Sequence, residues 1–97
     1  MKYRSRTEIF GEILTVARGT GVSRTKVMYK TILTFLQARE YLSILTERGL
    51  IQYDKATQTY RTTERGLKFL DKYTELSQLM KGLEEGRVTK LVSQEVS

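Results

Sequence analysis

Hydrophobic residues recur at helical spacing in the first part of the chain. Over residues 6–18 the apolar positions follow the i, i+3/i+4 pattern of a helix that buries one face. These positions are Ile9, Phe10, Ile13, Leu14 and Ala17. Ser5 or Thr7 can cap the start of this helix. Gly19 and Gly21 follow its last turn, where glycine readily takes a left-handed C-cap conformation.

Two more helices are predicted close together. The shorter one covers residues 24–30, begins after Ser23 as N-cap, and turns Val27 and Met28 inward. The longer one begins after Thr34, and its buried stripe is Ala38, Tyr41, Leu42 and Leu45. Residues 31–33 are the turn that separates them. A short helix, a three-residue turn and a longer helix together indicate a helix-turn-helix.

A β-hairpin is predicted directly after the third helix. Gly49 supplies the C-cap of that helix, and residues 50–53 and 59–62 are two short β-prone runs. The polar residues 54–58 between them have the length of a hairpin turn, whose tip is the wing. The expected fold class is therefore mainly α (α+β): a winged helix-turn-helix of three helices plus a β-hairpin wing, with a long C-terminal coiled-coil helix.

The last helix opens at residues 63–66, with Thr62 or Thr63 as its cap. Its apolar positions have the 4-3 spacing of a coiled-coil seam, about two heptads long. They are Phe69, Tyr73, Leu76, Met80 and Leu83. The alternative is that this stripe packs on the winged domain itself, but a helix running past the wing has little domain surface left to cover. We therefore expect dimerisation through this stripe, with residues 1–62 as the winged-helix DNA-binding domain and residues 63–97 as the dimerisation helix and tail, in one structural unit.

Positive charge is concentrated in the first two thirds of the chain. Residues 1–62 hold 11 Lys/Arg against 5 Asp/Glu, whereas residues 63–97 hold 6 against 6. The whole formal net charge of +6 thus lies on the winged-helix part. Solubility is one use of such charge, but its uneven distribution favours binding to a polyanion.

Several classes of function are disfavoured by composition. The 97 residues contain no cysteine and no histidine, which removes disulfides, the usual zinc ligands and histidine acid–base catalysis. No phosphate-binding glycine loop or catalytic triad is present, so we expect no enzyme activity, no cofactor and no small-molecule ligand. No apolar run is long enough for a membrane span, and no signal peptide is evident. The predicted location is cytoplasmic, associated with the nucleoid.

Three segments carry a resemblance to a known family: TKVMYK, LTFLQAREYLSILTERGLI and YDKATQTYRTTERGLKFL. Over about residues 4–80 the chain closely resembles archaeal winged-helix DNA-binding proteins of roughly 10 kDa, described either as chromatin proteins or as regulators. The resemblance implies a homodimer joined by an antiparallel coiled coil of the C-terminal helices. Gly82 and Gly86 depart from that pattern and weaken the helix.

The recognition helix would present its outward side chains to the major groove. These are Leu36, Gln37, Arg39, Glu40 and Ser43. Arg39 can pair with guanine or contact a phosphate, Gln37 can pair with adenine, and Ser43 can contact a phosphate. Phe35 and Leu36 can contact thymine methyl groups, or Phe35 can tuck under the second helix. A merely solvated face is the alternative for the polar positions.

Other residues are predicted to contact the DNA backbone. They are Arg24, Thr25, Lys26 and Lys30 at the second helix, with Lys55, Thr57 and Gln58 at the wing. Lys2, Arg4 and Arg6 form a basic N-terminal arm, which either follows the DNA backbone or is a solvated end. Arg61 is equally consistent with an ion-pair role.

The predicted function is binding of double-stranded DNA by a homodimer, as a transcription regulator or as a chromatin-architectural protein. The rival from another class is a winged helix used for protein–protein interaction without DNA. The basic charge of residues 1–62 argues against that rival.

Overall fold

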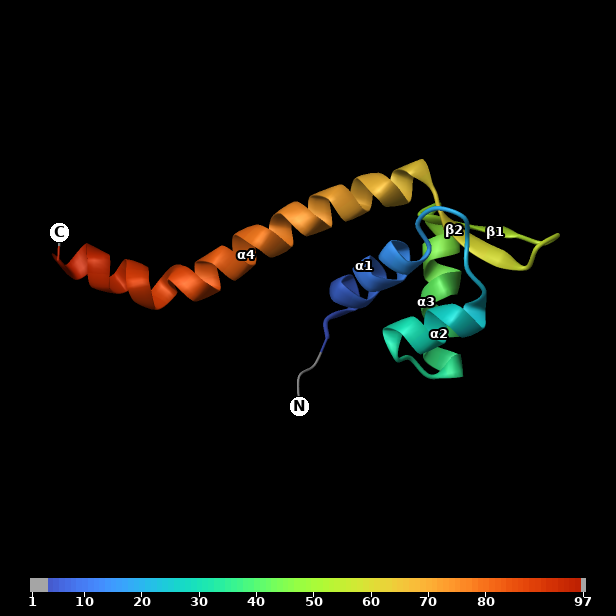
Figure 1. The fold of residues 1–97 in the computed structure, drawn as a ribbon, viewed down its shortest axis with the longest axis horizontal. Coiled ribbons are helices and arrows are strands. Elements are labelled where there is room, and N and C mark those ends of the chain that lie inside the picture. The colour runs from blue at the N-terminus through green and yellow to red at the C-terminus, as the bar shows by residue number, and fades with distance from the viewer. Residues whose placement is uncertain (1–3, 97) are drawn as a thin grey trace.

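The computed structural model describes the backbone of residues 4–96 and the side chains of residues 4–83. Its elements are α1 (Arg6–Val16), α2 (Arg24–Thr31), α3 (Phe35–Glu47), β1 (Ile51–Asp54), β2 (Thr59–Thr62) and α4 (Glu64–Val96). Helices α1 to α3 and the hairpin pack together, while α4 runs away from them (Figure 1). This order and packing confirm the predicted winged helix-turn-helix with a long C-terminal helix.

Side-chain caps set where the helices begin. Ser5 caps α1 in a capping box with Glu8, and Thr34 caps α3 in a capping box with Gln37. Of the two candidates for α4, Thr63 accepts a hydrogen bond from the Gly66 N–H at 3.1 Å. Each cap satisfies backbone N–H groups that have no partner inside the helix.

Two boundaries differ from the prediction. Helix α1 ends at Val16, two residues earlier than expected, and the Ala17 carbonyl accepts the Thr62 N–H at 3.0 Å. Strand β1 begins at Ile51, one residue later than expected. The Leu50 carbonyl accepts the Thr63 N–H at 3.1 Å, one pair beyond the end of the strands in the same register. The bond to Ala17 therefore joins the hairpin to the end of α1.

The hairpin is antiparallel, with Ile51 opposite Thr62 and Tyr53 opposite Tyr60. The loop between α1 and α2 adds a short third segment to it, which the sequence pattern did not predict. Val22 and Tyr60 exchange two backbone hydrogen bonds, at 2.8 and 2.7 Å. Because α2 begins at Arg24, this bridge fixes the start of α2 beside the wing.

The core draws apolar side chains from α1, α2, α3, β1 and α4. Its buried residues are Ile9, Ile13, Leu14, Ala17, Val22, Val27, Leu33, Ala38, Leu42, Leu45, Ile51 and Leu70. Leu70 lies on α4, so the first turns of that helix complete the core of the winged domain. A division at residue 62 therefore separates Leu70 from the core to which it belongs.

The predicted seam of α4 divides into two parts. Phe69 and Tyr73 pack partly against the core. The Tyr73 ring lies so close to Gly11 of α1 that a Cβ added to this glycine would be only 2.6 Å from the ring. By contrast, the more distal apolar residues are exposed. They are Leu76, Leu79, Met80 and Leu83.

A hollow of about 370 Å³ between α4 and the start of α1 leaves Leu76 and Met80 uncovered. The alternative of packing on the winged domain thus fits Phe69 and Tyr73 only. The α4 backbone continues through Gly82 and Gly86 to Val96, so these glycines do not end the helix.

Two glycines of α4 allow a matched test of packing. A Cβ on Gly66 would overlap the Leu50 carbonyl oxygen, whereas a Cβ on Gly82 would meet nothing within 4 Å. We expect Gly66→Ala to lower the free energy of unfolding by about 2 kcal/mol, because overpacking outweighs the gain in helix propensity. Gly82→Ala should raise it by about 1 kcal/mol. Urea denaturation measures both, and equal changes of the same sign would contradict the packing described.

No helix in the described part of the chain combines the length and apolar character needed to cross a membrane.

Candidate nucleic-acid interface

The N-terminus of α2 forms one edge of the candidate interface. The Ser23 hydroxyl accepts the Lys26 N–H at 3.1 Å, and the side chains of Arg24, Thr25 and Lys26 are exposed. The Arg24 guanidinium lies over the Phe35 ring of α3, 4.8 Å from its centroid. This cation–π contact holds Arg24 between the two helices of the motif. Phe35 is thus partly covered by α2, although the residue remains 46% exposed.

The outward face of α3 is a ridge at i, i+4, i+7 spacing. Its members are Leu36, Glu40, Ser43 and Glu47, all exposed and opposite the buried stripe. Arg39 is exposed on the flank of this ridge that faces the wing. The amide oxygen of Gln37 accepts the Thr34 N–H at 2.9 Å, so this side chain caps the helix and keeps its amide N–H₂ group available.

A groove of about 380 Å³ lies between α3 and the wing. Its lining brings together three of the predicted contact residues, Arg24, Arg39 and Ser43, with Tyr53 and Tyr60 of the hairpin. A second hollow of about 270 Å³ also includes Arg24 and both tyrosines. That hollow adds Thr25 from α2 and Gln58 from the wing. The start of α2, the recognition helix and the wing therefore form a continuous strip of surface.

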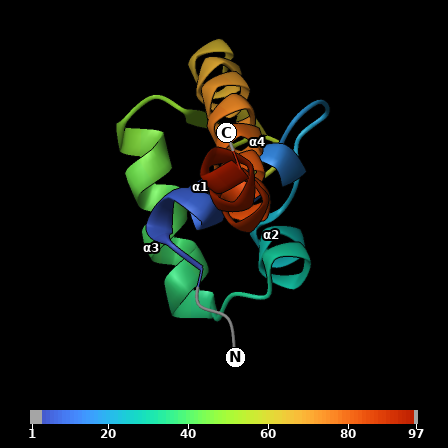
Figure 2. The ribbon, with the colours of Figure 1, turned by 90° about the vertical axis from the view of Figure 1, so that its left-hand side faces the viewer.

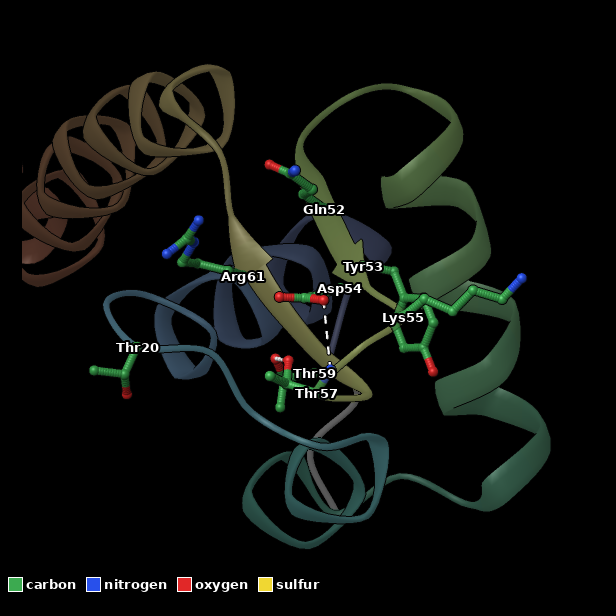
Figure 3. Close-up of a pocket in the computed structure, with 8 residues that line it drawn as sticks. All are labelled: Thr20, Gln52, Tyr53, Asp54, Lys55, Thr57, Thr59 and Arg61. Atoms are coloured by element: carbon green, nitrogen blue, oxygen red, sulfur yellow. Dashed lines mark hydrogen bonds between the residues drawn. The ribbon is translucent and has the colours of Figure 1, made fainter.

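The wing tip is a polar turn built on Asp54. The Asp54 carboxylate accepts the N–H of Ala56 at 2.9 Å, and the hydroxyls of Thr57 and Thr59 are 2.7 Å apart. Figure 3 shows Tyr53 and Lys55 extending on the side of the hairpin that faces α3, with Arg61 on the other side. Lys55 does not line the groove itself. Lys55 and Arg61 both line a further hollow of about 470 Å³ on the wing.

In the N-terminal arm, Arg4 and Arg6 contact the folded domain and are not part of a solvated end. The Arg4 guanidinium pairs with Glu12 at 2.5 Å and donates to the carbonyls of Thr31 and Ile32, at 2.6 and 3.3 Å. Arg4 thus ties the chain to the end of α2. Arg6 packs 5.8 Å from the centroid of the Tyr41 ring. Lys2 lies outside the described residues.

The cations predicted to contact DNA form no ion pairs. This holds within residues 4–83 for Arg24, Lys26, Lys30, Arg39 and Lys55, whereas Arg4 pairs with Glu12. Unpaired surface cations attract phosphate groups. No group of three potential metal-ligating side chains occurs in the same part of the chain.

Sequence reasoning missed Tyr53, Tyr60 and Glu47 as members of this surface. The two tyrosine rings form a cross-strand pair with centroids 4.7 Å apart, and this pair walls the groove. Strand alternation could have identified Tyr53. It lies on the same face of the hairpin as the buried Ile51 two residues earlier, and Tyr53 lines the groove together with residues of α3. Glu47 completes the outward ridge by helical spacing alone.

Comparison with known proteins gives one family match and similar folds. A family model described as winged helix-turn-helix matches residues 3–81. Sso10a-2, a DNA-binding protein from Sulfolobus solfataricus, aligns with a TM-score of 0.78 and 22% identity, covering 97% of this chain and 98% of that chain. The multiple antibiotic-resistance repressor MarR from Listeria monocytogenes aligns with a TM-score of 0.59 and 17% identity, covering 90% and 67%. The comparison with curated proteins produces no match. At these identities the structural similarities show the fold.

Proposed function

The chain belongs to the winged helix-turn-helix family, and from this premise we propose that it binds double-stranded DNA as a homodimer. Helix α3 enters the major groove, the start of α2 contacts the DNA backbone, and the wing contacts the flanking phosphates or minor groove. In the cell such a protein acts on the nucleoid, as a transcription regulator or as a chromatin-architectural protein. The Sulfolobus protein with the similar fold is itself described as DNA-binding.

The observation that carries this proposal is the groove between α3 and the wing. Arg24 and Arg39 both line it and neither forms an ion pair in the described residues. Lys26 and Lys30 on α2 and Lys55 on the wing are also exposed. A surface with unpaired cations from three elements suits the regularly spaced phosphates of a duplex better than it suits a neutral protein partner.

The homodimer rests on the distal part of α4. Leu76, Leu79, Met80 and Leu83 are symmetric about the midpoint between Leu79 and Met80. A stripe with this symmetry can pair with an identical antiparallel copy across a two-fold axis, as an isologous interface requires. Such pairing would bury the exposed stripe and set two winged domains at opposite ends of the dimer.

Fluorescence anisotropy with a labelled random-sequence duplex of about 30 base pairs tests DNA binding directly. We expect micromolar or tighter binding at low salt. Absence of binding at low salt would reject the proposed function and favour a protein partner for the winged domain. A selection for preferred sequences would then separate a regulator, which enriches one sequence, from an architectural protein, which enriches none.

Base reading and backbone binding are assigned to different residues. We expect Lys26→Ala to weaken binding to all duplexes by a similar factor, because Lys26 contacts phosphate. Arg39→Ala should instead change the preference between sequences, by about tenfold at the contacted base pair. Anisotropy with the selected sequence and with a scrambled one measures the ratio. An equal loss on both sequences for Arg39→Ala would assign Arg39 to the backbone as well.

A further inference from the structure

Large apolar side chains are exposed at the turn between α2 and α3. Tyr29 is 84% exposed, Ile32 83% and Leu36 69%, all within eight residues. Single exposed apolar residues are ordinary, but several gathered at one turn indicate a surface that meets a partner. The turn adjoins the basic strip defined above, because Arg24 lies over Phe35 next to Leu36.

Ile32 has a second unusual property. Its backbone is left-handed, with φ +54° and ψ +55°, a conformation that a β-branched residue rarely adopts. The Arg4 guanidinium holds this turn by binding the carbonyls of Thr31 and Ile32. The fold thus keeps a strained backbone conformation at Ile32. This strain is not offset by burial, because the Ile32 side chain lies in solvent. Strain maintained at an exposed position is typical of a functional site.

The ridge of α3 indicates what this surface meets. Leu36 stands in the first turn of α3, and the rest of the ridge is Glu40, Ser43 and Glu47. The centre of the ridge therefore carries no cation, while Arg24 and Arg39 lie on its flank. In a major groove the outward face of a recognition helix meets base edges, and Arg39 on its flank can still reach a guanine there. The apolar group that base edges offer there is the C5 methyl of thymine.

We propose that Leu36 and Ile32 contact thymine C5 methyl groups, so that the protein favours thymine at the base pairs under the first turn of α3. This inference rests on the proposed function of DNA binding. It assigns the sequence preference in part to apolar contact. Tyr29 is not required by it.

The test compares two random-sequence duplex pools, one with thymine and one with uracil in its place. Replacing thymine by uracil removes the C5 methyl group and keeps the base-pairing groups. We expect the unmodified protein to bind the thymine pool about fourfold more tightly for each buried methyl. Leu36→Ala, at an exposed position, should lower the ratio of the two affinities by about fourfold. Ile32→Ala is measured in the same way. The control Arg39→Ala should weaken binding to both pools and keep their ratio.

Three results would overturn the inference. One is equal affinity of the unmodified protein for both pools. Another is a thymine preference that survives both Leu36→Ala and Ile32→Ala. The third is a lower sedimentation mass of Leu36→Ala without DNA, which would make the surface a contact between copies of the chain. Failure to bind either pool would instead reject the proposed function itself, and this outcome is distinct from equal binding to the two pools.

Discussion

Raising the salt concentration from 50 to 200 mM is expected to weaken DNA binding by about a thousandfold. If a dimer contacts about six phosphates, the slope of log K against log[salt] is about −5, because each neutralised phosphate releases condensed counterions. The unpaired state of Arg24, Lys26 and Lys30 supports this number of contacts, since cations already held in ion pairs would contribute less.

Anisotropy titrations at four or more salt concentrations measure the slope. Lys26→Ala in both subunits should make it less steep by about 2, one unit for each lost phosphate contact. Lys81→Ala, on α4 and outside the lining of the groove, is the matched control and should leave the slope unchanged. A slope near zero would show that binding is not electrostatic and would contradict the phosphate contacts proposed for α2.

The second large effect is expected from Met80→Glu, which should dissociate the dimer and lower DNA affinity by about a hundredfold or more. A carboxylate in the middle of an apolar seam would be buried without a partner. Loss of the dimer removes the second winged domain, and with it the effective concentration that a linked second contact provides. Analytical ultracentrifugation measures the mass, and anisotropy measures the affinity.

Gln78→Glu is the control for that substitution. Gln78 is exposed and lies about 200° around α4 from Met80, so the same charge there should leave both mass and affinity unchanged. A dimer that survives both Met80→Glu and Leu76→Glu would place the interface elsewhere on the chain.

Because the chain has no cysteine, single cysteine substitutions report the direction of pairing. In an antiparallel pair centred between Leu79 and Met80, the two copies of Met80→Cys meet near the axis and should form a disulfide. The two copies of Leu83→Cys would be displaced by about 10 Å along the helix, beyond the reach of a disulfide. Efficient cross-linking through Leu83→Cys would indicate a parallel pair.

The candidate site could be predicted in part from the sequence. Helical periodicity placed Arg39 and Ser43 on the outward face of α3, and cap chemistry placed Arg24 and Thr25 at the exposed start of α2. Local patterns are reliable here because each depends on residues within one or two turns. The pairing of Tyr53 with Tyr60 and the stacking of Arg24 on Phe35 join residues of different elements, and periodicity carries no information about them.

The sequence by itself determined the order of the elements, the inward faces of α1, α2 and α3, the hairpin and the uneven charge. These features follow from spacing, caps and composition, which act locally along the chain. Only the tertiary structure decided that Arg4 binds Glu12 and the end of α2, that Val22 joins the hairpin, and that the seam of α4 divides after Tyr73. Each of these depends on where separate elements meet, because a side chain takes whichever partner the packing brings within reach.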